Sequence, residues 1–143
     1  VISGTTEGVA AASEALKAQK ARVVPLAVSA PFHSSLMRPA RERLALDLAK
    51  IQLHTPVFPV YSNVTAKPET GPARIQELLL EQITSPVRWV EILKDLQQRG
   101  ITQFLEFGSG RVLTGLVGRT LENVEARSLT NPQEVAESLA RNS

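Results

Sequence analysis

The chain has 143 residues, 43% of them hydrophobic and 21% charged, which is the composition of one ordinary globular domain with a buried core. Sixteen basic residues nearly balance fourteen acidic ones, and a net charge of +2 without basic runs is too small to predict a nucleic-acid-binding protein. The lack of cysteine excludes disulfides and thiolate chemistry, and two histidines are too few to predict a metal site.

The start of the chain predicts a fragment. Val1 lies in what reads as the stub of a strand, with no initiator methionine, so we expect part of a longer protein. No apolar stretch approaches the roughly 20 residues of a membrane helix, and no leader of charged, apolar and small residues is present. We therefore expect no membrane partner and a cytoplasmic location.

The first part of the chain predicts a β-α-β unit. After the strand stub at residues 1–3, Gly4 and Thr5 supply a turn and a helix cap. One helical face then carries Val9, Ala12 and Leu16. A strand rich in β-branched residues is expected over Val23–Val28.

Residues 28–37 predict a junction between a strand and a helix. Pro31 ends the strand by removing a backbone donor, and Ser34 or Ser35 can cap a helix that runs to about Lys50. Its apolar face would consist of Met37, Ala40, Leu44, Leu48 and Ile51. His33 then lies at the carboxyl end of a strand, where open α/β sheets place ligands. Its position alone leaves a structural role and proton transfer both open.

The middle of the chain predicts two helices after a loop and a short strand. Pro59 restricts the apolar segment Val57–Tyr61 to an edge or kinked strand, and Ala66–Pro72 is expected to be an exposed loop. One helix should begin at Pro72. A second should begin at Pro86, with Ser85 as cap and Trp89, Leu93 and Leu96 buried, and should end at Gly100.

The last part of the chain predicts two strands and two helices. The elements expected in order are a buried strand over Ile101–Phe107, a tight turn at Gly108–Gly110, a helix over residues 112–121, a strand over Ala126–Leu129, and a helix capped by Asn131. Strands that alternate with helices predict an α/β fold with a mostly parallel sheet.

Other candidate chemistry is weak. The loop Gly108–Gly115 lacks the third glycine of a dinucleotide fingerprint and the lysine of a P-loop. No serine lies in a Gly-x-Ser-x-Gly turn, and this excludes Ser34, Ser35, Ser62 and Ser109 as nucleophiles of that type. Glu106 is expected to cap neighbouring amides, with the orientation of a site as the alternative, and His54 is expected in a solvated loop.

Four segments at characteristic intervals carry a family resemblance. They are Val1-Ile2-Ser3-Gly4, Val28-Ser29-Ala30-Pro31-Phe32-His33-Ser34-Ser35-Leu36-Met37, Gln82 with Ser85-Pro86-Val87-Arg88-Trp89, and Glu106-Phe107-Gly108-Ser109-Gly110-Arg111-Val112-Leu113-Thr114-Gly115-Leu116. On these segments the whole chain resembles the C-terminal part of the malonyl-CoA:acyl carrier protein transacylases of type II fatty-acid synthesis. The family commonly has Gly-Pro-Gly-Lys where this chain has Gly108-Ser109-Gly110-Arg111.

The resemblance implies a two-part fold and a ping-pong acyl transfer. Residues 1–28 would end a small ferredoxin-like subdomain, and residues 29–143 would form the C-terminal part of an α/β-hydrolase-like acyltransferase core. A serine would take malonyl from malonyl-CoA and pass it to the phosphopantetheine thiol of acyl carrier protein, with no cofactor.

The resemblance also implies roles for particular residues. His33 matches the general base and acid, and Gln82 matches the residue whose main-chain carbonyl orients it, so that a change of the Gln82 side chain should matter little. Phe32, Met37 and Asn63 would contact the substrate. Arg22 would lie near a basic surface that contacts the carrier protein.

The nucleophile half of such an enzyme is absent from this sequence. The Gly-x-Ser-x-Gly turn, the arginine for the malonyl carboxylate and the oxyanion hole belong to the family's N-terminal half, so this chain alone should be inactive and that half is an expected partner. The alternative is a non-catalytic α/β module that binds an acyl or phosphorylated ligand through residues 29–37 and 108–115.

Overall fold

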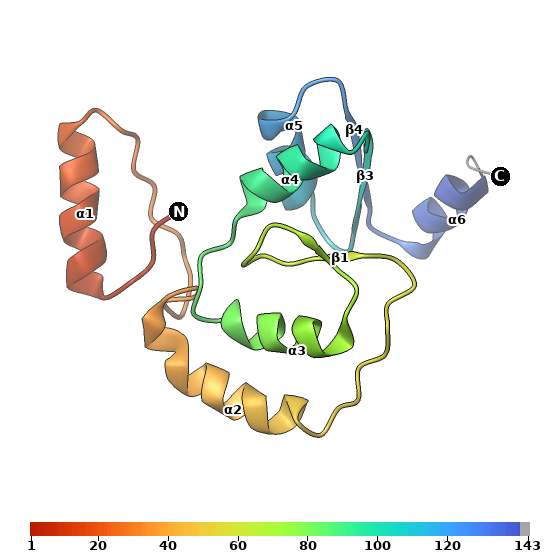
Figure 1. The fold of residues 1–143 in the computed structure, drawn as a ribbon. Coiled ribbons are helices and arrows are strands. Elements are labelled where there is room, and N and C mark those ends of the chain that lie inside the picture. Colours follow the sequence, from red (N-terminus) through yellow and green to blue (C-terminus); the bar gives the residue numbers. More distant parts are fainter. Residues whose placement is uncertain (141–143) are drawn as a thin grey trace. The chain divides into compact units, whose positions relative to one another are not determined.

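The computed structural model describes residues 1–140. The chain folds into two compact units, the first comprising Val1–Arg88 and the second beginning at Trp89. Figure 1 gives the order of the elements along the chain. Among the described residues, no helix has both the length and the apolar character that a bilayer crossing requires.

The first helix is formed as predicted, but the strands expected beside it are not. Helix α1 spans Thr6–Ala18, and Thr5 caps it by accepting the Gly8 N–H at 3.0 Å. Residues 1–3 and 23–28 belong to no strand, so the predicted β-α-β unit is wrong for this part of the chain. A strand is stable only beside a hydrogen-bonded neighbour, and no described residue pairs with Val23–Val28. The side chains of Val24, Leu26 and Val28 are 59%, 60% and 62% exposed.

The predicted helix after His33 is present in two pieces. A 3₁₀ turn, η1, spans Ser35–Met37 and leads into α2, Arg38–Leu48, which has a proline in its first turn. The predicted serine cap is wrong, because neither η1 nor α2 has a side-chain cap and the Ser34 hydroxyl donates to the Pro31 carbonyl at 2.7 Å.

Helix α3 spans Pro72–Glu81 and begins at Pro72 as predicted. It packs against α2, where Leu48 is buried, and contributes the buried side chain of Leu78. Gln76 Nε2 also donates to the Leu48 carbonyl at 2.7 Å, so a hydrogen bond joins α3 to the end of α2.

A short antiparallel hairpin precedes α3. Strand β1 is Val60–Tyr61 and strand β2 is Pro68–Glu69, paired as Val60 with Glu69 and Tyr61 with Pro68. The predicted strand over Val57–Tyr61 is shortened, because Pro59 supplies no N–H for pairing. The prediction of an exposed loop over Ala66–Pro72 is wrong at its start, where Ala66 is only 4% exposed.

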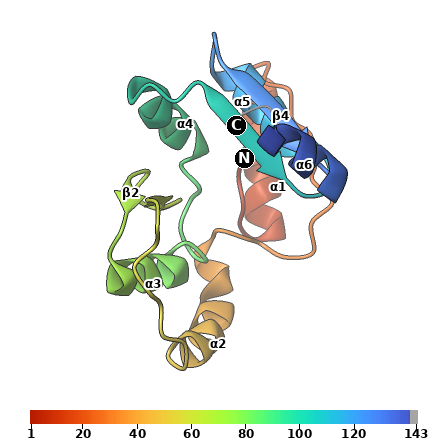
Figure 2. The same ribbon diagram turned by 90° about the vertical axis from the view of Figure 1, so that its right-hand side faces the viewer.

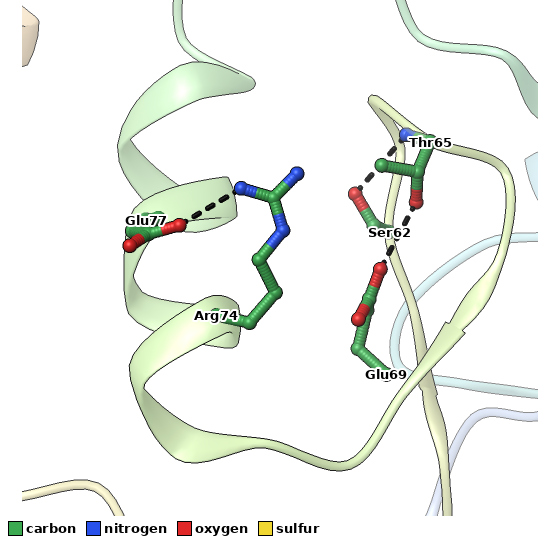
Figure 3. A network of polar contacts seen from close by, with 5 residues as sticks. All are labelled: Ser62, Thr65, Glu69, Arg74 and Glu77. Carbon is green, nitrogen blue, oxygen red and sulfur yellow. Dashed lines mark hydrogen bonds and ion pairs between the residues drawn. The ribbon is translucent and has the colours of Figure 1, made fainter.

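The hairpin turn is closed by its own side chains. The Ser62 hydroxyl accepts the N–H groups of Val64 at 3.1 Å and Thr65 at 3.3 Å, and the Thr65 hydroxyl donates to Glu69 at 3.3 Å. Figure 3 shows the Ser62, Thr65 and Glu69 contacts beside the Arg74 to Glu77 ion pair on α3. Residues 62–66, called the hairpin turn below, are thus held by local hydrogen bonds.

The second unit contains a parallel β-α-β unit. Strand β3, Gln103–Phe107, pairs in parallel with β4, Glu125–Leu129, and α5, Val112–Thr120, connects them. Gly108 and Gly110 have φ angles of +123° and +103°, and the tight turn predicted there is confirmed. In Figure 2 the two strands lie side by side, with α5 and α6 packed next to them.

The helices at the two ends of this unit, α4 and α6, were both predicted as helices from the sequence. Helix α4 spans Trp89–Gln98 and ends before Gly100, whose φ of +85° confirms the predicted stop. It begins at Trp89 instead of Pro86, and the Arg88 N–H, directly before it, donates to the Asn63 carbonyl at 3.0 Å. Helix α6 spans Pro132–Ala140, and Asn131 Oδ1 accepts the Glu134 N–H at 3.0 Å, as the predicted cap requires.

The core of the second unit lies between α4 and α5. Leu93, Val117 and Leu121 are 2%, 3% and 6% exposed, and Trp89, Phe104, Val124 and Ala126 pack around them. Helices packed on a parallel strand pair make this unit an α/β arrangement, the fold class that the alternation of elements predicts.

Candidate active site

His33 sits in a constrained turn. Its φ is +59°, in the left-handed region that few residues other than glycine adopt, and histidine is among the residues that tolerate it best. The turn is closed on both sides, because the Phe32 N–H donates to the Ala30 carbonyl at 2.9 Å and the Ser34 hydroxyl donates to the Pro31 carbonyl. Strained backbone concentrates at functional sites, and nothing in the sequence signals it here.

A pair of substitutions at His33 isolates the cost of this backbone conformation. His33→Gly and His33→Ala both remove the ring, but only alanine keeps a Cβ that clashes in the left-handed region. We expect the glycine variant to be more stable by about 1 kcal/mol in urea unfolding of the 143-residue chain. Lower stability of the glycine variant would contradict the left-handed assignment.

The His33 ring meets the end of α3. Its Nδ1 lies 2.9 Å from the main-chain oxygen of Gln82, which is the C-cap residue of that helix. This oxygen also accepts the Ser85 N–H, at 3.4 Å, and its second lone pair is available to the ring. It also stands at the negative end of the helix dipole. A ring that donates from Nδ1 presents Nε2 as the basic nitrogen.

Asn63 meets Gln82 from the other side. Its Nδ2 donates to Gln82 Oε1 at 2.9 Å, and the contact is partly buried. His33, Asn63 and Gln82 therefore come together, although Gln82 follows His33 by 49 positions and Asn63 by 19. A cavity of about 50 Å³ beside Gln82 is too small for an acyl thioester, since it has room for only a few waters.

The other predicted contact residues lie close to His33 in sequence. Phe32 directly precedes it and is 45% exposed, whereas Met37 ends η1 and is half-buried. Arg22 is exposed in the segment that follows α1. No described hydrogen bond links Arg22 to His33, Asn63 or Gln82.

Sequence reasoning missed Arg88 as part of this region. Its guanidinium donates from Nη1 to the carbonyls of Val64 at 3.3 Å and Thr65 at 3.2 Å, so it holds the hairpin turn that carries Asn63. Arg88 lies in the segment Ser85–Trp89 that carries the family resemblance, but no role was assigned to it from the sequence.

Glu106 occupies the start of α5. Its carboxylate accepts the N–H of Leu113 at 3.1 Å, and the N–H and hydroxyl of Thr114 both at 2.7 Å, so the predicted capping role is confirmed. These hydrogen bonds, first of all the one from the Thr114 N–H, lower the pKa of Glu106. The helix N-terminus in the loop Gly108–Gly115 already holds an anion of the chain itself, and this disfavours binding of a phosphate there.

Neutralising this carboxylate should weaken the second unit in a pH-dependent way. Because the folded-state pKa of Glu106 lies below the ordinary value of 4.5, its stabilisation is present above that value and is lost as the pH falls through the folded pKa. Glu106→Gln should therefore lower the urea midpoint at neutral pH and change it much less near about pH 3. Glu122→Gln is the exposed control. An equal loss at both pH values would contradict the assignment.

The remaining candidates have structural roles or stand apart. The hydroxyls of Ser34 and Ser62 are engaged in their own turns, and His54 is exposed in a loop, as predicted. Within residues 1–140, no group of three or more His, Cys, Asp or Glu side chains is arranged to hold a metal ion.

Comparison with known proteins gives one consistent family. The family described as acyl transferase domain matches residues 1–143. The malonyl CoA-acyl carrier protein transacylase of Salmonella typhimurium is 39% identical over 142 residues, which cover 99% of this chain and 46% of that protein. The corresponding Bacillus subtilis protein is 43% identical over 136 residues, covering 94% of this chain and 43% of that protein.

Solved structures give the same result. A malonyl-transacylase in complex with its type II PKS acyl-carrier protein has a TM-score of 0.90 at 40% identity, over 97% of this chain and 45% of that one. The acyl-carrier-protein S-malonyltransferase of Bartonella henselae has a TM-score of 0.90 at 36% identity, over 96% of this chain and 44% of that protein. This chain thus spans somewhat less than half the length of the relatives that it matches.

Proposed function

Since the chain belongs to the acyl transferase domain family, we propose that it forms the histidine-bearing part of a malonyl-CoA:acyl carrier protein transacylase of fatty-acid biosynthesis. The observation that carries the proposal is the 2.9 Å contact between His33 Nδ1 and the Gln82 carbonyl. It presents an oriented imidazole with Nε2 available for proton transfer.

The proposed reaction has two acyl transfers on a serine of the remaining half of the enzyme. In the first, the serine oxygen attacks the malonyl thioester carbonyl, His33 Nε2 takes the hydroxyl proton, and the departing coenzyme A thiolate receives that proton. In the second, the phosphopantetheine thiol gives its proton to Nε2 and attacks the seryl ester. The proton then returns to the serine oxygen.

Gln82 supports both transfers through its main chain. Its carbonyl accepts from Nδ1 and so selects the tautomer in which Nε2 is the base, as the acid of a catalytic triad does. The positive charge that the ring acquires faces the C-terminal end of α3, where the helix dipole contributes about 0.3–1 kcal/mol of stabilisation. The Gln82 carbonyl can therefore orient the His33 ring in the way that the carboxylate of a catalytic triad does.

Recognition of the two substrates is proposed for four further residues. Phe32, beside the base, and Met37 and Asn63 would contact the malonyl group and its carrier, and Arg22 would contact the acidic carrier protein. One related malonyl-transacylase was solved in complex with an acyl-carrier protein. The cavity of about 50 Å³ beside Gln82 is not lined by His33, so we propose that the acyl pocket forms between His33 and the remaining half of the enzyme.

The N-terminal half of the same enzyme is the proposed structural partner. Residues 1–28 would end a ferredoxin-like subdomain, and residues 29–143 would belong to an α/β-hydrolase-like core. The exposed side chains of Val24, Leu26 and Val28 support a missing structural partner, because an unpaired apolar segment of this kind fits a strand whose neighbour lies in another part of the enzyme.

A direct assay tests the proposal. Malonyl transfer to acyl carrier protein is measured with the 143-residue chain alone and after addition of the complementary N-terminal segment. We expect no turnover alone and turnover together. Turnover by the chain alone would refute the assignment of the serine to the other half. Tight, saturable malonyl-CoA binding without any transfer in the mixture would favour the non-catalytic module.

A further inference from the structure

We propose that Asn63 is a positioning residue for acyl transfer, which holds Gln82 so that its carbonyl faces His33. This inference rests on the proposed function and concerns the same site. Gln82 is the meeting point of two hydrogen bonds of different kinds. Its main-chain oxygen receives His33 Nδ1 and its side-chain oxygen receives Asn63 Nδ2, both at 2.9 Å.

The end of α3 needs such a brace. The Gln82 N–H still donates to Leu78 at 3.0 Å, as in a regular helix. Beyond it, Ile83 donates to Leu80 at 3.4 Å, Thr84 to Glu81 at 3.2 Å and Ser85 to Gln82 at 3.4 Å, which are longer bonds between residues three apart. A helix end with such bonds frays readily, so the helix alone does not fix the direction of the Gln82 carbonyl.

Asn63 is well placed to act as that brace, because its own backbone is held. The Asn63 carbonyl accepts the Arg88 N–H at 3.0 Å, and the Arg88 guanidinium binds the next two carbonyls of the hairpin turn. The Ser62 hydroxyl closes the same turn from within, and Thr65 joins it to Glu69 on β2 (Figure 3). Asn63 thus connects a turn held by several side chains to a helix end whose last backbone hydrogen bonds are long, at 3.2–3.4 Å.

The hydrogen bond from Asn63 gives the Gln82 side chain a role in holding the direction of the Gln82 carbonyl. The sequence-based expectation that this side chain is dispensable took only the main-chain carbonyl into account. Loss of either amide should instead let the carbonyl turn from His33. An asparagine amide has a second N–H and an oxygen, so the brace is compatible with a substrate contact by Asn63.

The test uses the complete transacylase that contains this chain. Asn63→Leu, Gln82→Met and the double variant each remove the side-chain contact and keep the volume. Gln76→Met is the matched control. Gln76 lies on the same helix, and its partly buried amide donates to the Leu48 carbonyl at 2.7 Å and not to a residue of the site. The readouts are kcat, KM for malonyl-CoA, and the His33 ring nitrogen chemical shifts, which report the tautomer.

A hydrogen bond of ordinary strength predicts a roughly three- to tenfold lower kcat for Asn63→Leu and Gln82→Met. KM should stay nearly unchanged in Gln82→Met, whereas Asn63→Leu, which also removes the proposed substrate contact, should raise KM as well. The double variant should be no worse than either single one, since both remove the same contact. The fraction of His33 protonated on Nδ1 should fall in all three. Gln76→Met should alter neither kcat nor the tautomer. Asn63→Asp should keep most of the activity, because the Gln82 amide can rotate and donate to the carboxylate.

Two results would overturn the proposal. One is an unchanged tautomer and kcat in Gln82→Met, a variant that leaves Asn63 intact. The other is a raised KM with unchanged kcat in Asn63→Leu, which would make Asn63 a substrate contact only. The ring shifts are read without turnover, so they decide the positioning role even if His33→Ala leaves kcat intact and the proposed function fails.

Discussion

Replacement of His33 by alanine in the complete transacylase is expected to lower kcat for malonyl transfer by roughly 10²–10⁴-fold, with little change in KM. The variant removes the group that we propose takes the serine proton and gives it to the leaving thiolate. The structure gives this ring an oriented position, in a turn closed by Ser34 and with Nδ1 against the Gln82 carbonyl. We therefore expect the ring to stabilise the transition state more than it strengthens the binding of malonyl-CoA, so its loss should affect kcat and not KM.

The measurement is steady-state transfer at varied malonyl-CoA, together with the rate at which the malonyl-enzyme forms. His54→Ala is the control, because His54 is the other histidine of these 143 residues and is exposed in a loop. We expect its kcat to equal that of the parent enzyme. Near-normal formation of the malonyl-enzyme by His33→Ala would remove His33 from the role of base.

Truncation of Leu93 is expected to cost about 2–5 kcal/mol of unfolding free energy, the largest effect on stability that we predict. Leu93 is 2% exposed and forms a buried cluster with Val117 and Leu121. Leu93→Ala would leave a cavity between α4 and α5, where the surrounding helices can collapse only in part.

This loss can be observed without signals from the other unit. Trp89 is the only tryptophan, and it packs against the same cluster, so its fluorescence during urea unfolding reports on the second unit. Leu139→Ala is the control, because the same truncation at a side chain that is 65% exposed should cost less than about 0.5 kcal/mol. Equal losses in the two variants would show that Leu93 is not a core residue.

Elements with a local cause were predictable. The caps at Thr5 and Asn131, the start of α3 at Pro72 and the stop at Gly100 depend on neighbours within four residues, and the structure has all of them. The parallel pair β3 and β4 also follows from local patterns, because both strands and the connecting helix lie within one continuous segment.

Elements that depend on distant partners were not predictable. Val23–Val28 has the residues of a strand but remains unpaired among the described residues, since residue type does not supply a neighbouring strand. Helix α4 begins at Trp89, three residues later than predicted, and the residue before it, Arg88, donates its N–H to the Asn63 carbonyl, 25 positions upstream (88 minus 63). The expected exposed loop begins with the buried Ala66, which lies in the hairpin turn and donates its N–H to the Ser62 carbonyl at 3.0 Å, and it contains the strand residues Pro68 and Glu69.

The candidate site divides in the same way. The sequence by itself determined the type of each helix, the caps at Thr5 and Asn131 and the capping role of Glu106, and the proposal for His33 and Gln82 came from the family resemblance. Only the tertiary structure decided the left-handed backbone of His33, the contact of Asn63 with the Gln82 side chain and the bracing by Arg88. The physical reason is range: capping and periodicity act within a helical turn, whereas these contacts join segments that only the folded chain brings together.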